Sequence, residues 1–119
     1  MSVARGKQPV LIETLKAAGA IVADRFVAGP KSGATQAGNG VAAIGVAEVS
    51  AATGEFFSAV SSGVTVVEAG AAVADGDYVQ SNASGQAITA AAGVKLGRAR
   101  SAASGAGVLI HVALIPVAV

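Results

Sequence analysis

The stretch Ala18-Gly19-Ala20-Ile21-Val22-Ala23-Asp24 recurs as Ala69-Gly70-Ala71-Ala72-Val73-Ala74-Asp75, with six of the seven residues identical. Four further blocks match at an offset of 51 or 52: Phe26-Val27 with Tyr78-Val79, Ser32-Gly33 with Ser84-Gly85, Ile44-Gly45 with Leu96-Gly97, and 51–54 with 102–105. Single matches are common in a chain rich in Ala and Gly, but a nearly constant offset over five blocks is not. A solenoid or propeller needs about three copies to bury a continuous core. The repeat therefore predicts two similar half-domains packed together.

The length sets the domain organisation. A chain of 119 residues is typical of one compact domain. We expect an arm and first strand over residues 1–16, followed by a single domain over 17–119 whose halves cover about 18–63 and 69–117. Large side chains are few, with three Phe, one Tyr, one Met and no Trp. The core is therefore expected to be thin, so that association with other chains would add stability.

The charge and the hydrophobic pattern argue against several classes of protein. A net charge of +1 with 13% charged residues gives no basic surface for nucleic acid. There are no cysteines for disulfides or thiolate metal sites. The most hydrophobic run, 108–119, is interrupted by His111 and Pro116 and is shorter than the ~20 residues of a membrane-spanning helix. No signal peptide is evident at the N-terminus, and we expect neither a membrane nor a nucleic-acid partner.

Short β-prone runs separated by turn residues predict an all-β fold, a compact sandwich or barrel with an extended N-terminal arm. The run 9–16 also fits a short helix that begins at Pro9, but its β-branched content favours a strand. Ser61-Ser62-Gly63 predicts a hairpin or a crossing between sheets, and Gly45 a bulge or a close backbone neighbour. About nine strands are expected: 9–16, 25–28, 41–49, 55–60, 64–68, 78–80, 86–89, 94–100 and 108–115.

No constellation of residues points to catalysis, a metal or a cofactor. His111 is the only histidine, and a lone strand histidine is more often a packed or edge residue than a base. There is no Gly-x-Ser-x-Gly nucleophile elbow. Asp75-Gly76-Asp77 is better explained as a turn than as a cation site, which needs more carboxylates. Residues 29–33 lack the glycines and the following helix of a phosphate-binding loop.

Three charged residues are candidates for contacts with a partner. Arg98 and Arg100 are two apart on a predicted strand, so they project from one face and are suited to an acidic partner surface. A solvated strand face explains them about as well. The repeat aligns Glu48 with Arg100, which gives the two halves opposite charges at equivalent positions. We expect this pair to face different neighbours in an assembly.

Several motifs together carry a family resemblance. Residues 18–24 followed by 25–27, then 44–48, 52–55, 63–70 and 75–79, resemble the capsid cement, or head decoration, proteins of tailed bacteriophages. The C-terminal segments 96–99, 107–110 and 115–116 resemble the final strands of that family. The likeness covers nearly the whole chain after Pro9, and it rests on the order and spacing of the motifs.

The resemblance implies an all-β subunit that binds the major capsid protein on the outer surface of the expanded phage head, commonly as homotrimers, and strengthens the shell against internal DNA pressure. It implies no catalysis and no cofactor. In related assemblies an N-terminal arm adds to an edge strand, a mode in which main-chain hydrogen bonds supply affinity. We therefore expect 2–15 to contact the shell, with Arg5, Lys7, Val10 and Ile12 among the contacts.

Two rival functions belong to other classes. One is a β-sandwich adhesion or receptor-binding module displayed on a virion or cell surface, for which the chain has few exposed aromatic residues to offer. The other is an enzyme, which the shortage of acid and base groups argues against.

Overall fold

The computed structural model describes residues 8–115, which fold into an all-β structure without helices. The predicted fold class is therefore confirmed. Pro9 begins no helix, because its run pairs as a strand along its whole length. The nine strands are β1 (Gln8–Lys16), β2 (Phe26–Ala28), β3 (Thr35–Gln36), β4 (Gly45–Ala47), β5 (Phe56–Glu68), β6 (Tyr78–Ser81), β7 (Ala87–Thr89), β8 (Gly97–Ala99) and β9 (Leu109–Leu114).

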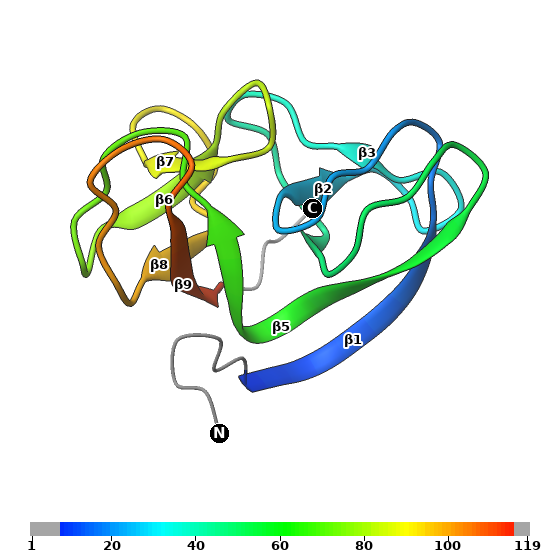
Figure 1. Ribbon diagram of the computed structural model, residues 1–119, viewed down its shortest axis with the longest axis horizontal. Helices are drawn as coiled ribbons and strands as arrows, with labels where there is room; N and C mark the ends of the chain where they lie inside the picture. The colour runs from blue at the N-terminus through cyan, green and yellow to red at the C-terminus, as the bar shows by residue number, and fades with distance from the viewer. Residues whose placement is uncertain (1–7, 116–119) are drawn as a thin grey trace.

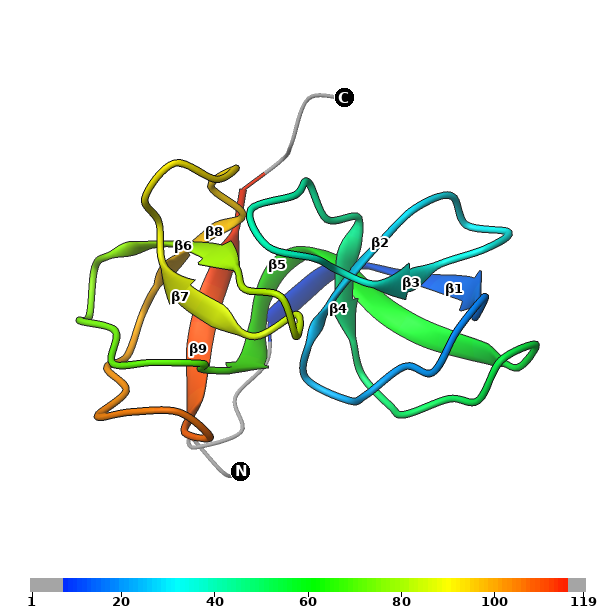
Figure 2. The same ribbon diagram turned by 90° about the horizontal axis from the view of Figure 1, so that it is seen from above.

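The strands form one continuous sheet with the order β3-β2-β4-β5-β9-β8-β6-β7, and β1 pairs with the other edge of β5. Every pairing between named strands is antiparallel. The sheet curls into a half-barrel at each end of the molecule, joined through β5 (Figures 1 and 2). It is a single curled sheet rather than the two separate sheets of a sandwich.

β5 differs from the prediction of two strands separated at 61–63. It is one strand of 13 residues, because β1 pairs with it across that segment, from Gln8↔Val64 to Lys16↔Phe56. Gly63 has φ +100°, which glycine adopts without strain, and β5 bends sharply between its two ends (Figure 1). The Ser-Ser-Gly segment therefore marks a bend within a strand, where the sequence predicted a hairpin or a crossing between sheets.

The pairing of the first half recurs in the second. The pair Phe26↔Val46 corresponds to Tyr78↔Arg98, and the bridge Ile21↔Ala51 to Val73↔Ala103, each displaced by 52 residues. The left-handed residue Asp24, with φ 63°, corresponds to Gly76 with φ 94°. The offset of 51 seen in the first and last sequence blocks thus differs by one from the structural correspondence. β5 lies between the two sets of recurring pairs and takes part in pairing on both sides.

Close backbone packing explains two glycines that occupy the same position in the two copies of the repeat. A Cβ added at Gly45 would lie 2.7 Å from the carbonyl oxygen of Val60, and one at Gly97 would lie 2.7 Å from that of Ala113. Of the two explanations offered for Gly45, the close backbone neighbour is therefore right. Both glycines let a short strand approach β5 or β9.

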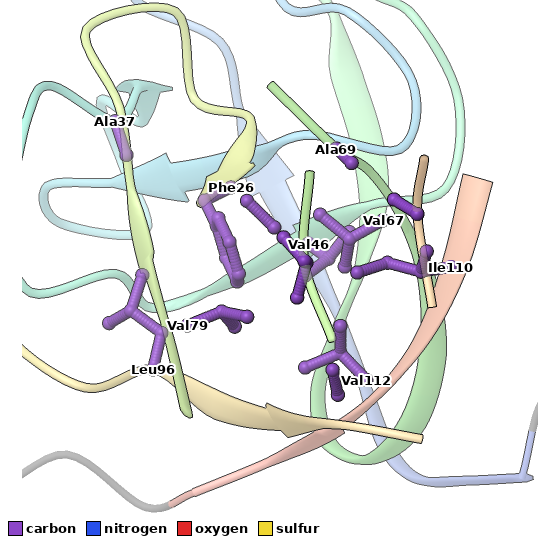
Figure 3. Close-up of a cluster of buried hydrophobic side chains, with 13 residues drawn as sticks. Phe26, Ala37, Val46, Val67, Ala69, Val79, Leu96, Ile110 and Val112 are labelled. Carbon is purple, nitrogen blue, oxygen red and sulfur yellow. The ribbon is translucent and has the colours of Figure 1, made fainter. Parts of the chain in front are cut away.

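The core is divided into two clusters. The smaller cluster belongs to the first half and includes Leu15, Val27 and Phe57. The larger cluster lies mainly in the second half but also takes in Phe26, Ala37 and Val46 from the first (Figure 3). These three side chains therefore bind the halves to each other.

The remaining differences from the predicted strands lie in segments that are mostly loop in the structure. The predicted strand 41–49 is reduced to β4, and 94–100 is reduced to β8. The segment 31–40 contains β3, which sequence reasoning placed in a loop. Two or three paired residues within Gly-rich or Ala-rich segments give too short a pattern for a strand to be recognised.

Candidate docking surface

β1 is an edge strand with an exposed end. In the described part of the chain it pairs with β5 alone. Its first five residues, 8–12, are all exposed, whereas Leu15 near its other end is buried. The N-terminal part of β1 and the middle of β5 thus form a ribbon at the edge of the sheet.

Three consecutive apolar side chains lie on this ribbon. Val10 is 80% exposed, Leu11 50% and Ile12 48%. Together these three side chains expose a continuous run of apolar surface along the ribbon. Edge strands in soluble proteins are usually short or charged, which prevents pairing with other chains. A long edge with three adjacent apolar residues is typical of a surface that binds a partner.

The register between β1 and β5 is irregular next to these residues. It shifts between Pro9 and Leu11 and again between Leu11 and Ile12. The hydroxyl of Ser61 donates a hydrogen bond to the carbonyl oxygen of Leu11, at 3.3 Å. Irregularities of this kind raise the local twist and redirect side chains. They coincide with the segment at which β5 bends.

The predicted contact residues fall into separate groups. Val10 and Ile12 lie on the exposed part of β1, whereas Arg5 and Lys7 lie outside the described residues. Arg98 on β8 and Arg100 just after it are exposed and line one shallow cleft of about 180 Å³ with Asp75, Gly76 and Ala99. Glu48 follows β4 in the first half. Its N–H donates to Ser58 as that of Arg100 donates to His111, so the two positions are structurally equivalent.

Sequence reasoning missed an aromatic residue beside this cleft. Tyr78 is 43% exposed, and its ring carries the ammonium of Lys95 at 4.9 Å and the guanidinium of Arg98 at 5.6 Å from its centroid. Stacking of cations on an aromatic face contributes about 0.5–1 kcal/mol at exposed sites. The repeat aligns Phe26 with Tyr78, and this change from phenylalanine to tyrosine could have pointed to the residue.

His111 lies on β9 and is half-buried, and its backbone N–H donates to the hydroxyl of Ser101 at 3.0 Å. Over residues 8–115 there is no group of three His, Cys, Asp or Glu side chains placed to hold a metal ion. Within the same residues no helix is long and apolar enough to span a membrane.

The comparisons with known proteins identify the family. The family model described as phage cement protein matches residues 4–114. The chain belongs to the phage cement protein family. Among curated proteins none matches it. A solved structure, the head fiber gp8.5 N base in bacteriophage phi29, is similar in fold, with a TM-score of 0.73 and 19% identity over 88% of this chain and 93% of that one.

Membership of the cement family makes this chain a structural protein associated with the phage capsid. The all-β fold, the exposed edge and the similar fold of a head fiber base agree with that role. The resemblance read from the sequence is thus confirmed at the level of the family.

Proposed function

We propose that this cement protein binds the outer surface of the expanded phage head, contacts the major capsid protein through β1, and stabilises the shell against internal DNA pressure. The observation that carries the proposal is the exposed edge of β1 with Val10, Leu11 and Ile12. The family and the similar head fiber base support a place on the capsid.

The physical basis is addition of a strand. The edge of β1 that faces away from β5 offers backbone N–H and C=O groups to an extended segment or a sheet edge of the capsid protein. Burial of the apolar side chains adds about 1.5–3 kcal/mol for each one that is fully covered. Main-chain hydrogen bonds and three apolar side chains together suit a partner that presents a strand.

We further propose that the protein acts as a homotrimer and that Arg5, Lys7, Glu48, Arg98 and Arg100 take part in contacts with the capsid or between subunits. A trimer presents three β1 edges to a shell of matching symmetry. Once one edge is bound, the others act at a high effective concentration, which raises avidity without any new contact.

Binding of the purified protein to expanded, undecorated capsids tests the proposal. We expect co-sedimentation and density at symmetric sites on the outer surface in cryo-electron microscopy. The double variant Val10→Asp with Ile12→Asp places two charges on the ribbon and should weaken binding at least about tenfold, a loss of about 1.4 kcal/mol or more. Deletion of 2–8 should weaken it as well.

Val22→Asp serves as the matched control. Val22 is 39% exposed and lies in the loop between β1 and β2, so the same change of chemistry occurs away from the ribbon. This variant should bind as the natural protein does. Equal binding by the β1 variant and the control would remove β1 from the contact. Absence of any binding to intact capsids would reject the cement role and favour an adhesion module.

A further inference from the structure

The two halves of the chain meet through a defined contact. The turn 82–85 between β6 and β7 of the second half lies against the start of β2 in the first. The N–H of Phe26 donates to the carbonyl oxygen of Gly85 at 2.8 Å. The guanidinium of Arg25 donates to the carbonyl oxygen of Ser84 at 3.3 Å and pairs with Glu68 at 2.9 Å. The first half thus supplies a receiving edge, and the second supplies a turn and a carboxylate.

Each of the two contacting surfaces has a counterpart in the other half, and these counterparts lie at the ends of the molecule. The receiving residues Arg25 and Phe26 correspond to Asp77 and Tyr78, since the pair Phe26↔Val46 corresponds to Tyr78↔Arg98. At the same displacement of 52 residues, the turn 82–85 corresponds to 30–33, and Glu68 corresponds to Lys16. β6 and the end of β1 lie at opposite ends of the molecule in both views (Figures 1 and 2).

Both copies are uncovered. Tyr78 is 43% exposed, whereas Phe26 is fully buried. Pro30, Lys31 and Ser32 are exposed as well. The turn 30–33 is held by its own half, where the N–H of Lys16 donates to the carbonyl oxygen of Lys31 at 2.9 Å. The molecule therefore carries one exposed receiving edge and one exposed turn, each related by the repeat to a surface that is already engaged between the halves.

One pair of charges at these ends is complementary, and it lies beside the cations of Lys95 and Arg98 on the Tyr78 ring. Inside the molecule the pair is Arg25 with Glu68, a cation on the receiving edge and an anion beside the turn. At the free ends the same positions hold Asp77 and Lys16, so both signs are reversed and the pair still attracts. Lys31 on the turn is already neutralised by Glu13, with 3.2 Å between Nζ and Oε2.

The residue types at the free edge also fit a contact between separate molecules. Phe26 and Val46 of the internal contact are replaced by Tyr78 and Arg98. Tyrosine and arginine are enriched in interfaces between proteins that also exist apart, because they combine a large contact area with polar groups that tolerate water.

We propose that the free edge at Asp77 and Tyr78 binds the turn 30–33 and Lys16 of a second copy of this chain. The contact repeats between molecules the one that joins the two halves within a molecule. It is a head-to-tail contact, which closes into a ring when the rotation between copies allows. The inference rests on the self-association part of the proposed function and is independent of capsid binding.

A charge exchange tests this contact with the full chain and without capsids. Lys16→Glu and Asp77→Lys each place like charges across the contact, and each should weaken self-association, measured by sedimentation equilibrium, about tenfold. The double variant restores an attractive pair in reversed order and should return to within about threefold of the natural protein. Ser104→Glu, which adds a charge at an exposed turn, should have no effect.

The rescue separates the contact from a loss of folding. Asp77 accepts hydrogen bonds from Ala74 and Thr89, each at 3.3 Å, so its replacement alone also loosens a turn. A second substitution at the opposite end of the same chain does not repair that turn. A double variant that associates no better than the weaker single variant would overturn the proposal, as would a natural protein that stays monomeric at every concentration. Since capsids are absent, failure of capsid binding is a separate result.

Discussion

The two halves of this protein have the same pairing pattern but different surroundings. Phe26 and Tyr78 occupy equivalent places at the start of β2 and β6, yet one is fully buried and the other is 43% exposed. The difference arises because side chains of the second half pack around Phe26 in the larger core cluster, and no described segment covers Tyr78 in that way. The strand pairing thus sets the backbone, whereas a neighbouring half decides which equivalent side chain becomes core.

The largest expected effect comes from truncating these two aromatic residues. Phe26→Ala should lower the free energy of unfolding by about 3–5 kcal/mol, because it leaves a cavity in the cluster that joins the halves. Tyr78→Ala should lower it by about 1 kcal/mol or less, because it removes only an exposed ring and its cation contacts. Urea unfolding of both variants measures the difference. Similar losses in the two variants would contradict the difference in burial between Phe26 and Tyr78.

A smaller effect is expected at the glycines of the two turns. Gly85 has φ +75°, and an added Cβ would lie 3.0 Å from the carbonyl oxygen of Phe26. Gly85→Ala should therefore cost about 2 kcal/mol. At Gly33 the nearest atom to an added Cβ is the Cβ of Ala18 at 3.6 Å, an ordinary contact.

Gly33→Ala should change the free energy of unfolding by about 0.5 kcal/mol or less in either direction. Thermal unfolding under identical conditions compares the two variants. A large loss for Gly33→Ala would mean that the turn 30–33 is as tightly constrained within the single chain as the turn 82–85, which would contradict the difference between the two glycines.

The smallest expected effect sharpens the comparison between β1 and the end of β5. Thr65 is 1% exposed, and its hydroxyl oxygen has no hydrogen-bond partner among the described residues. Thr65→Val keeps the shape and removes that unsatisfied group, so it should raise the free energy of unfolding by about 1 kcal/mol. Its counterpart on β1 is Glu13, which pairs with Lys31.

The exposed Thr14 provides the control for this change. Thr14→Val should alter the free energy of unfolding by about 0.5 kcal/mol or less. The midpoint of urea unfolding gives the change for both variants, provided that the dependence of the free energy on urea concentration is the same. Destabilisation by Thr65→Val would indicate that the hydroxyl is satisfied in solution.

Much of the fold follows from local patterns in the sequence. Alternation and β-branched content located β1, and turn residues bounded β2, β6 and β7. The lack of a side chain at Gly45 indicated a bulge or a close backbone neighbour, and the structure has the close neighbour, Val60. The exposed residues Val10 and Ile12 were also selected from the sequence, because the resemblance to the cement family implied an N-terminal arm that contacts the shell.

The remaining features depend on contacts between distant residues. The continuity of β5 through Ser61 and Gly63 is imposed by β1, which lies about fifty residues earlier, and no local pattern reports it. The exposure of Tyr78 depends on which distant segments pack around it, in contrast to Phe26, rather than on its own neighbours in sequence. The repeat detected both halves but placed its first and last blocks one residue away from the structural correspondence, because Ala-rich segments align nearly as well in either register.

The place of β5 in both halves also has a consequence for folding during synthesis. β1 emerges first, but each of its partners lies between Phe56 and Val64. The first half therefore cannot close its sheet until about half of the chain has been made, and β9 must then find the same strand from its other side. Such long sequence separations slow the folding of all-β domains. The apolar residues of β1 thus stay unpaired in a newly made chain until Phe56–Val64 has been made.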